Sequence, residues 1–215
     1  MNLLARRLPL ALLAMALLSI TVTLVVRWTT DGGPLLIIHT AVLGIYLCWL
    51  LAEAATTVRS SRTTEAATDR GTVNVYATFR LVTLVTAVFV ANDWTGFRPW
   101  MPVAAVVFTG SVVFRLWAIR TLGHFYSHRV RLVGEHRLIT TGPYRLVRHP
   151  AYTGMAISHI AFVLLFLNPF SAGALVALLL PTLVVRIMIE EKVLLEIPEY
   201  AEFAARRKRL IPFVW

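Results

Sequence analysis

The amino-acid sequence predicts an all-α, polytopic integral membrane protein with about six transmembrane helices and a C-terminal interfacial helix. Hydrophobic residues make up 58% of the 215 residues and charged residues only 15%, which is far from the composition of a soluble domain. The apolar residues form six long runs. None of these runs alternates with polar residues as a barrel strand does.

The six predicted transmembrane helices comprise residues 8–26, 35–55, 75–91, 100–119, 151–167 and 171–189. Arg6 and Arg7 precede the first run, as in a signal peptide, but the run is long for a signal core and no small-residue cleavage site follows it. We therefore expect a retained first helix. Residues 168–171 leave so short a turn that the last two helices should form an antiparallel hairpin, residues 151–189.

Two polar segments complete the predicted fold. Residues 58–72 are rich in Thr, Ser and Arg and predict a loop. Residues 200–210 predict a helix at the membrane interface, with Tyr200, Phe203 and Leu210 toward the bilayer or the loop. The basic run 206–209 would then face lipid phosphates.

The basic residues predict an orientation in the membrane. Outside the predicted helices, one side holds only Arg27 and Arg98, whereas the other collects the basic residues of both termini, of the 58–72 segment and of the 120–150 loop. Because cytoplasmic loops are enriched in Lys and Arg, we expect both termini and this loop to be cytoplasmic. The net charge of +10 then faces anionic headgroups, and we expect no nucleic-acid partner.

Metal chemistry has little support in the sequence. Cys48 stands alone, so the chain offers no intramolecular disulfide and no Cys-based metal site. His124 and His128 have no acidic residue at ligand spacing, and we expect no bound metal. His39 and His159 lie within predicted helices, where we expect hydrogen-bonded interior histidines.

The polar stretch 141–154 is the first candidate for chemistry. Gly142-Pro143 forces a turn, Pro150 suits the first turn of a helix, and Gly154 permits close approach of a ligand or a helix. A helix N-terminus also favours a bound carboxylate. The alternative is that Arg148-His149-Pro150 merely anchors the membrane edge and starts the helix.

The second candidate is Arg186 with Glu190 and Glu191, near the end of the last predicted span. Charge at this depth is costly and is usually functional. At 100° per residue Arg186 and Glu190 share a helix face, while Glu191 lies about 140° from Arg186, so the two carboxylates should play different roles. The alternative is a simple i,i+4 salt bridge that holds the helix end.

Together these motifs resemble the isoprenylcysteine carboxyl methyltransferase family over about residues 120–212. The motifs are Phe125-x-x-His128, His136-x-Leu138-x-Thr140-Thr141-Gly142-x-Tyr144, Arg148-His149-Pro150-x-Tyr152-x-Gly154, Asn168-Pro169, and Arg186 with Glu190-Glu191. The Arg-His-Pro motif and the Glu-Glu pair also recur in the wider group that contains phospholipid N-methyltransferases. We divide the chain into N-terminal membrane helices, residues 1–119, and a catalytic half, residues 120–215.

The resemblance implies a membrane enzyme that uses S-adenosylmethionine. Because the 120–150 loop is predicted to be cytoplasmic from its basic residues, we expect the cofactor site on that side. The implied cofactor contacts are His136, Leu138, Gly142, Tyr144, His149, Pro150, Tyr152, Gly154 and Glu190. Arg186 and Glu191 are the implied catalytic residues, at the junction with a lipophilic substrate.

The expected activity is methyl transfer to the carboxylate of an isoprenylcysteine-like acceptor. An ionised carboxylate needs no base, but it needs a cation that holds it in line, and Arg186 offers a planar, bidentate partner. The closest alternative is N-methylation of an amine lipid, which would need a base such as Glu191 or His149. Two further alternatives are a non-catalytic membrane scaffold of the same fold and a membrane reductase that uses a nicotinamide cofactor.

Overall fold

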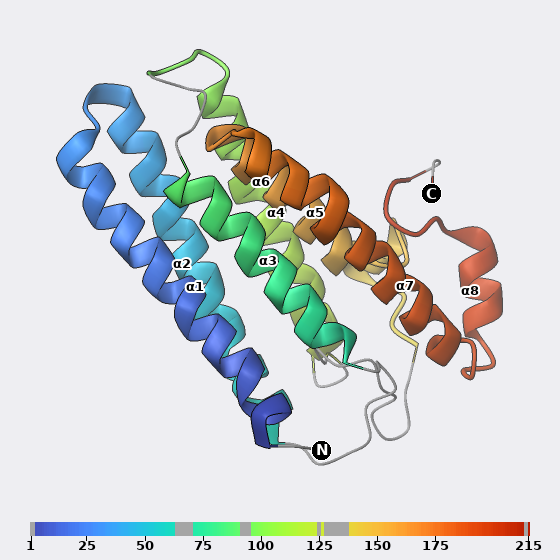
Figure 1. Cartoon of the computed structure of the whole chain (residues 1–215). Coiled ribbons are helices and arrows are strands. Elements are labelled where there is room, and N and C mark those ends of the chain that lie inside the picture. The colour runs from blue at the N-terminus through green and yellow to red at the C-terminus, as the bar shows by residue number, and fades with distance from the viewer. Residues whose placement is uncertain (1–2, 63–70, 91–95, 124–125, 127–137, 213–214) are drawn as a thin grey trace.

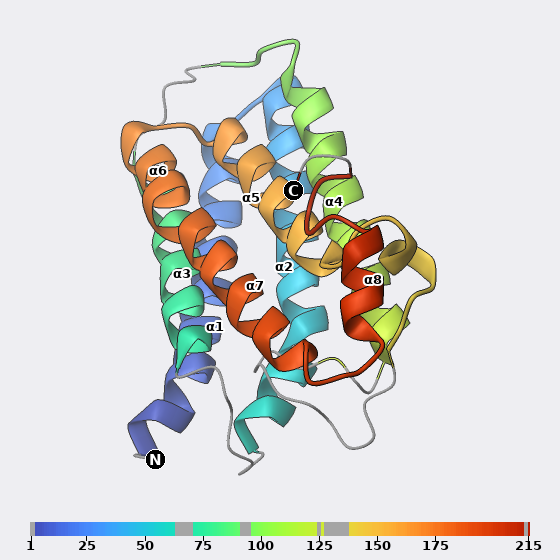
Figure 2. The ribbon, with the colours of Figure 1, turned by 90° about the vertical axis from the view of Figure 1, so that its right-hand side faces the viewer.

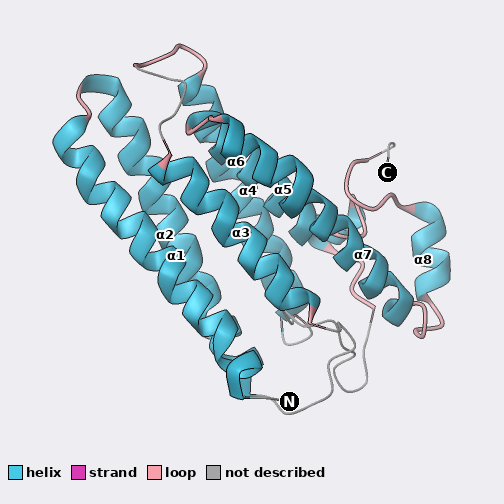
Figure 3. Cartoon of the chain, in the orientation of Figure 1, coloured by secondary structure: helices cyan, strands magenta, loops and turns pink. Residues whose placement is uncertain are grey.

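The computed structural model describes residues 3–62, 71–90, 96–123, 126, 138–212 and 215. The described residues form helices, loops and turns, with no strand among them (Figure 3). The helices are α1 (Leu3–Thr30), α2 (Gly33–Arg62), α3 (Thr72–Phe89), α4 (Met101–Leu122), the 3₁₀ turn η2 (Gly142–Arg145), α5 (Pro150–Leu165), α6 (Pro169–Ala174), the π-helical η3 (Leu175–Leu179), α7 (Leu180–Leu194) and α8 (Tyr200–Arg206).

The predicted all-α, polytopic membrane fold is confirmed. By length and composition, five helical stretches among the described residues can cross a membrane: Leu8–Thr30, Gly33–Ala54, Thr72–Phe89, Met101–Leu122 and the continuous α6–η3–α7 stretch Pro169–Leu194. Helix α5 is apolar but has only 16 residues, which is short for a full span.

The helices form one bundle whose core takes side chains from α1 to α5 and from the η3–α7 stretch. Helices α1 and α2 run side by side as an antiparallel pair, and α3 lies against α1 and the α6–α7 stretch (Figures 1 and 2). In the core the ring of Tyr46 stacks on that of Phe108, with centroids 5.9 Å apart, and lies 4.9 Å from Phe162. Large aromatic side chains thus join the N-terminal helices to the C-terminal half.

Helices α4 and α5 pack directly against each other, and Gly154 makes their close approach possible. A Cβ atom on Gly154 would lie 2.7 Å from the backbone oxygen of Ser111 and 2.8 Å from Cβ of Arg115. No side chain fits there without separating the two helices. The close approach expected at Gly154 is therefore an approach of helix to helix.

The short turn between α5 and α6 is confirmed as the head of an antiparallel hairpin. Asn168 caps α6, because its side-chain oxygen accepts a hydrogen bond from the backbone N–H of Ser171 at 2.9 Å. Its side-chain amide also donates to the carbonyl of Thr86 at 2.9 Å. The hairpin is thereby attached to α3.

Two predicted boundaries are wrong. Residues 58–72 are expected to form a loop, but helix α2 continues through the first of them to Arg62. Residues 63–70 of the same segment lie outside the described residues. Helix α8 ends at Arg206 instead of near residue 210, because Arg207 has an extended backbone. The residues that follow α8 lie on the start of α5: the backbone N–H of Arg148 donates to the carbonyl of Lys208 at 2.8 Å.

The two histidines within the helices are hydrogen-bonded interior groups, as expected. His39 lies 2.6 Å from a carboxylate oxygen of Asp31, and His159 lies 3.1 Å from the hydroxyl of Tyr46. Both side chains are buried.

Candidate active site

The candidate site lies where the start of α5, the end of α7 and the residues after α8 meet, toward the end of the bundle that also holds the N-terminus (Figures 1 and 2). Pro150 begins α5, because its missing N–H costs nothing in a first helical turn. His149 is therefore held at the N-cap position, facing α7. The side of the membrane on which this end lies stays a prediction.

Glu191 binds three cationic or potentially cationic side chains. Its Oε1 lies 2.7 Å from Nη1 of Arg148 and 3.2 Å from Nε2 of His149, and its Oε2 accepts a hydrogen bond from Nε of Arg209 at 2.8 Å. Glu191 is buried, so these partners replace the water that an ionised carboxylate requires. Both carboxylate oxygens of Glu191 are therefore occupied. Glu191 is suited to hold the start of α5 and the C-terminal segment, the residues that follow α8, in place.

Glu190 differs from its neighbour in exposure and in partners. Its side chain is 30% exposed, and its Oε1 lies 3.9 Å from Nδ1 of His149. Tyr152 interacts with both Glu190 and Arg186. The expected difference between the two carboxylates thus exists in the structure: Glu190 is open to solvent or a ligand, whereas Glu191 is enclosed by protein.

Arg186 is buried on the face of α7 that contacts α3. Its Nη1 donates to the hydroxyl of Thr72 at 3.1 Å, and its guanidinium carbon lies 5.5 Å from the centre of the Tyr76 ring. Arg186 also interacts electrostatically with Glu190, one helical turn farther on. The guanidinium is thereby fixed between α3 and α5.

The loop residues expected at the cofactor site fall into two groups. Tyr144 is buried against Ala118 and Ala151, and Gly142 takes a left-handed backbone with φ of 57° close to Thr121. Leu138 packs instead with the cluster around Tyr200 on α8. His136 lies outside the described residues.

Burial, reinforced by the nearby Glu190 carboxylate, raises the pKa of the Tyr144 phenol well above its usual value. Tyr144 therefore stays neutral at any physiological pH. It can donate a hydrogen bond but cannot serve as a base.

Comparison with known proteins tests the resemblance. Residues 103–196 match the sequence profile described as the Isoprenylcysteine carboxyl methyltransferase (ICMT) family. The predicted resemblance to this family is confirmed. The matched segment includes most of α4 and the whole α5–α7 hairpin, and with them most of the candidate site. Thr72 and Tyr76 of α3 and the residues after α8 lie outside it.

Three relatives carry names from the same family. Protein-S-isoprenylcysteine O-methyltransferase B of Arabidopsis thaliana is 33% identical over 106 residues, which are 47% of this chain and 54% of that protein. The probable protein-S-isoprenylcysteine O-methyltransferase of Oryza sativa subsp. indica is 35% identical over 113 residues, 51% of this chain and 59% of that protein.

The protein-S-isoprenylcysteine O-methyltransferase of Saccharomyces cerevisiae is 38% identical over 104 residues, 46% of this chain and 44% of that protein. The chain thus spans about half the length of the curated relatives it matches.

The methyl donor that this family implies fits the polar groups present. S-adenosylmethionine carries a sulfonium, an ammonium and a carboxylate. Glu190 and the ring of Tyr152 offer a negative and an aromatic partner for its cationic groups. The buried Nε of Arg148 has no hydrogen-bond partner among the described residues, and such a donor fits a ligand carboxylate.

Sequence reasoning missed two parts of the site. The sequence predicts that Arg209 faces lipid phosphates, but this residue lies on Glu191 and over the ring of Trp215, so the prediction is wrong for Arg209. Thr72 and Tyr76 of α3 carry no motif and reach Arg186 only through the fold. The basic run itself is the one available signal for Arg209.

Proposed function

We propose that this protein is an S-adenosylmethionine-dependent membrane methyltransferase whose acceptor is the carboxylate of an isoprenylcysteine-like lipid. The observation that carries the proposal is the meeting of Arg186, Glu190 and Tyr152 beside His149, within the segment that matches the family. A cation for the acceptor and an anion for the donor thus lie on successive turns of α7.

On the donor side, Glu190 and Tyr152 would hold the cofactor, together with His149 and the unpartnered Nε of Arg148. Bound S-adenosylmethionine supplies a methyl group already activated by the adjacent sulfonium. Glu191 contributes indirectly, because it fixes Arg148 and His149 in the positions that the cofactor would meet. We therefore assign Glu191 a positioning role and no role as a base.

On the acceptor side, Arg186 would bind the substrate carboxylate. Its guanidinium is preorganised by Thr72 and by the Tyr76 ring, so little conformational freedom is lost when the acceptor binds. A carboxylate oxygen then forms the new C–O bond while the methyl C–S bond breaks. The products are a neutral methyl ester and a neutral thioether, and no proton is transferred.

The apolar helices around this position suit a lipophilic acceptor. Helix α7 turns Val185 and Met188 outward beside Arg186, and both side chains are about half exposed on the bundle surface. An isoprenoid chain could therefore lie along the helices within the bilayer while its carboxylate reaches Arg186. Alignment of the acceptor carboxylate with the methyl group of S-adenosylmethionine, in a site poor in water, would accelerate the transfer without a general base.

The test uses the purified full chain in detergent with methyl-labelled S-adenosylmethionine. The two acceptors offered are an N-acetylated S-farnesylcysteine and phosphatidylethanolamine. A methyl ester releases labelled methanol in mild base, whereas an N-methyl group does not. We expect base-labile transfer to the prenylcysteine.

The same experiment separates the rival functions. Base-stable label on the amine lipid would favour N-methylation, with His149 as the base. Binding of the donor without transfer to either acceptor would contradict the proposed acceptor class. Absence of donor binding in calorimetry would favour a non-catalytic scaffold and overturn the proposal, and oxidation of NADPH would favour a reductase.

A further inference from the structure

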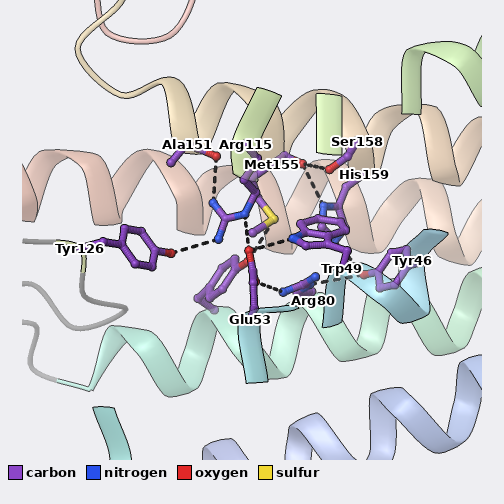
Figure 4. A network of polar contacts seen from close by, with 11 residues as sticks. Tyr46, Trp49, Glu53, Arg80, Arg115, Tyr126, Ala151, Met155, Ser158 and His159 are labelled. Carbon is purple, nitrogen blue, oxygen red and sulfur yellow. Dashed lines mark hydrogen bonds and ion pairs between the residues drawn. The ribbon is translucent and has the colours of Figure 1, made fainter. Parts of the chain in front are cut away.

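A buried ionic network joins α2, α3 and α4 to the start of α5, and the proposed reaction does not use it directly (Figure 4). Glu53 of α2 is its centre. The Oε1 atom of Glu53 accepts hydrogen bonds from Nε of Arg115 at 2.7 Å and from the indole N–H of Trp49 at 2.8 Å. Its Oε2 accepts from Nη1 of Arg80 at 3.3 Å.

The network is enclosed by protein and aromatic rings. Glu53 is 4% exposed and Arg115 is 3% exposed. The guanidinium carbon of Arg80 lies 4.3 Å from the centre of the Trp49 ring. Charges at such depth persist only when they are paired, and they are rarely retained without a functional reason.

Arg115 connects the network to the start of α5. While its Nε binds Glu53, its Nη1 donates to the carbonyl of Ala151 at 2.9 Å, and its Nη2 donates to the hydroxyl of Tyr126 at 3.2 Å (Figure 4). Ala151 directly follows Pro150 and lies one residue before Tyr152. One guanidinium thus holds the first turn of α5 and a loop residue at the same time.

The α4–α5 contact makes this connection rigid. Gly154 packs directly on the backbone of Ser111 and on Cβ of Arg115, so the first turns of α5 cannot shift without moving Arg115. Tyr76 adds a second tie, because its hydroxyl donates to the sulfur of Met155 at 3.1 Å. His149 and Tyr152, which flank Pro150 and Ala151 at this turn, are the residues assigned to the methyl donor.

The two partners come from different parts of the chain. Arg115 lies within the segment that matches the family, residues 103–196, whereas Glu53 lies outside it on α2. The N-terminal helices therefore contribute a charge on which an arginine of the matched segment depends. Without that carboxylate, Arg115 would lose its close anionic partner at Nε.

We propose that Glu53 is a positioning residue for the methyl-donor site, acting through Arg115 on the first turn of α5. This inference rests on the proposed function, because its readout is the affinity for S-adenosylmethionine. Glu53 touches neither substrate nor donor. It fixes the guanidinium that fixes the Ala151 carbonyl, and thereby the direction in which Tyr152 and His149 face Glu190.

The test compares Glu53→Gln, Glu53→Asp and Arg115→Lys with the native chain. Gln keeps the size of Glu53 but removes its charge, and Asp keeps the charge with a shorter reach. Lys keeps the charge of Arg115 but lacks the planar fork that reaches Glu53, Ala151 and Tyr126 at once. The matched control is Glu202→Gln, which breaks an exposed ion pair with Arg206 on α8. The measurements are KM for the donor, KM for a prenylcysteine acceptor, kcat, and donor binding by calorimetry.

We expect Glu53→Gln to raise the donor KM about tenfold and to leave the acceptor KM within about twofold. Glu53→Asp should restore part of the donor affinity, and it provides the test if Glu53→Gln does not fold. Arg115→Lys should raise the donor KM by a similar factor, and the double variant should be no worse than Arg115→Lys alone, because both changes break one pathway.

Other outcomes overturn the inference in distinguishable ways. A lower melting temperature with both KM values unchanged would mean that Glu53 only stabilises the bundle. Additive effects in the double variant would mean that Glu53 does not act through Arg115. If the native chain binds and transfers normally, these results reject the positioning role alone, whereas a native chain that binds no donor rejects the proposed function.

Discussion

The guanidinium of Arg148 and the carboxylate of Glu191 lie 2.7 Å apart, although they are distant in the sequence. This pair joins the residue before the α5 N-cap to the last turn of α7. His149 and Arg209 complete the contacts of the same carboxylate. One acidic side chain thus adds to the backbone hydrogen bonds that join the start of α5 to the residues after α8.

Replacing Glu191 with Ala should leave Arg148 and Arg209 without their shared anion. Removing one partner of a buried ion pair costs about 3 kcal/mol or more. We expect a lower melting temperature in detergent and a weaker affinity for S-adenosylmethionine. Glu196→Ala is the matched control, because that carboxylate is exposed and lies near the end of the same helix. Equal melting temperatures for the two variants would contradict this account of Glu191.

Replacing Arg186 with Ala should remove the cation that orients the acceptor. Loss of a preorganised hydrogen-bonding side chain from a reaction site lowers turnover by about 10²–10³-fold. We expect that loss in kcat with donor binding in calorimetry largely kept. Arg186→Lys should recover little activity, because an ammonium cannot bind a carboxylate in bidentate fashion. Weak donor binding with normal turnover at saturation would instead place Arg186 on the donor side.

The long helices could be predicted from the sequence because the bilayer imposes a simple requirement on them. Each long apolar run predicts a helix, because a segment that faces lipid must satisfy its backbone N–H and C=O groups with its own hydrogen bonds. The end of α2 was not predictable in this way. Polarity alone does not end a helix, and residues 58–62 contain neither Gly nor Pro to interrupt it.

The candidate site was only partly predictable, for a related reason. Periodicity places Arg186 and Glu190 on one face of a helix, and their interaction follows from that spacing. The partners of Glu191 depend instead on how α5, α7 and the C-terminal segment are placed in space, which no local pattern encodes. Glu53 shows the same limit, because its contact with Arg115 spans 62 positions of the chain.

Replacing Gly154 with Ala should separate α4 and α5. The new Cβ would meet the Ser111 carbonyl and the Arg115 side chain at distances well below van der Waals contact. Overpacking of this kind costs about 1–3 kcal/mol, measurable as a lower melting temperature. Gly110→Ala on α4 is the control, since a Cβ atom there would have no neighbour within 4 Å, and Ala should stabilise the helix by about 0.5–1 kcal/mol. Similar melting temperatures for both variants would show that the helices adapt.

The carboxylate of Asp31 should make the stability of the α1–α2 hairpin depend on pH. Partial burial raises its pKa, but the hydrogen bond from His39 and the charge of Arg27 outweigh burial, so the pKa lies below its usual value of 3.8. His39 in turn stacks on Phe166 of the α5–α6 turn, with centroids 4.7 Å apart. Protonation of Asp31 should therefore weaken the contact between the two hairpins.

Because the folded state lowers the pKa of Asp31, its stabilising effect is present above about pH 4 and is lost as the pH falls further. We expect the native chain to melt at a higher temperature than Asp31→Asn at about pH 6, and the difference to shrink as the pH approaches about 3. Thermal unfolding of both proteins in the same detergent measures it, and the comparison cancels other groups that titrate in this range. A difference that stays constant, or grows with acidification, would show that Asp31 does not stabilise the fold through its charge.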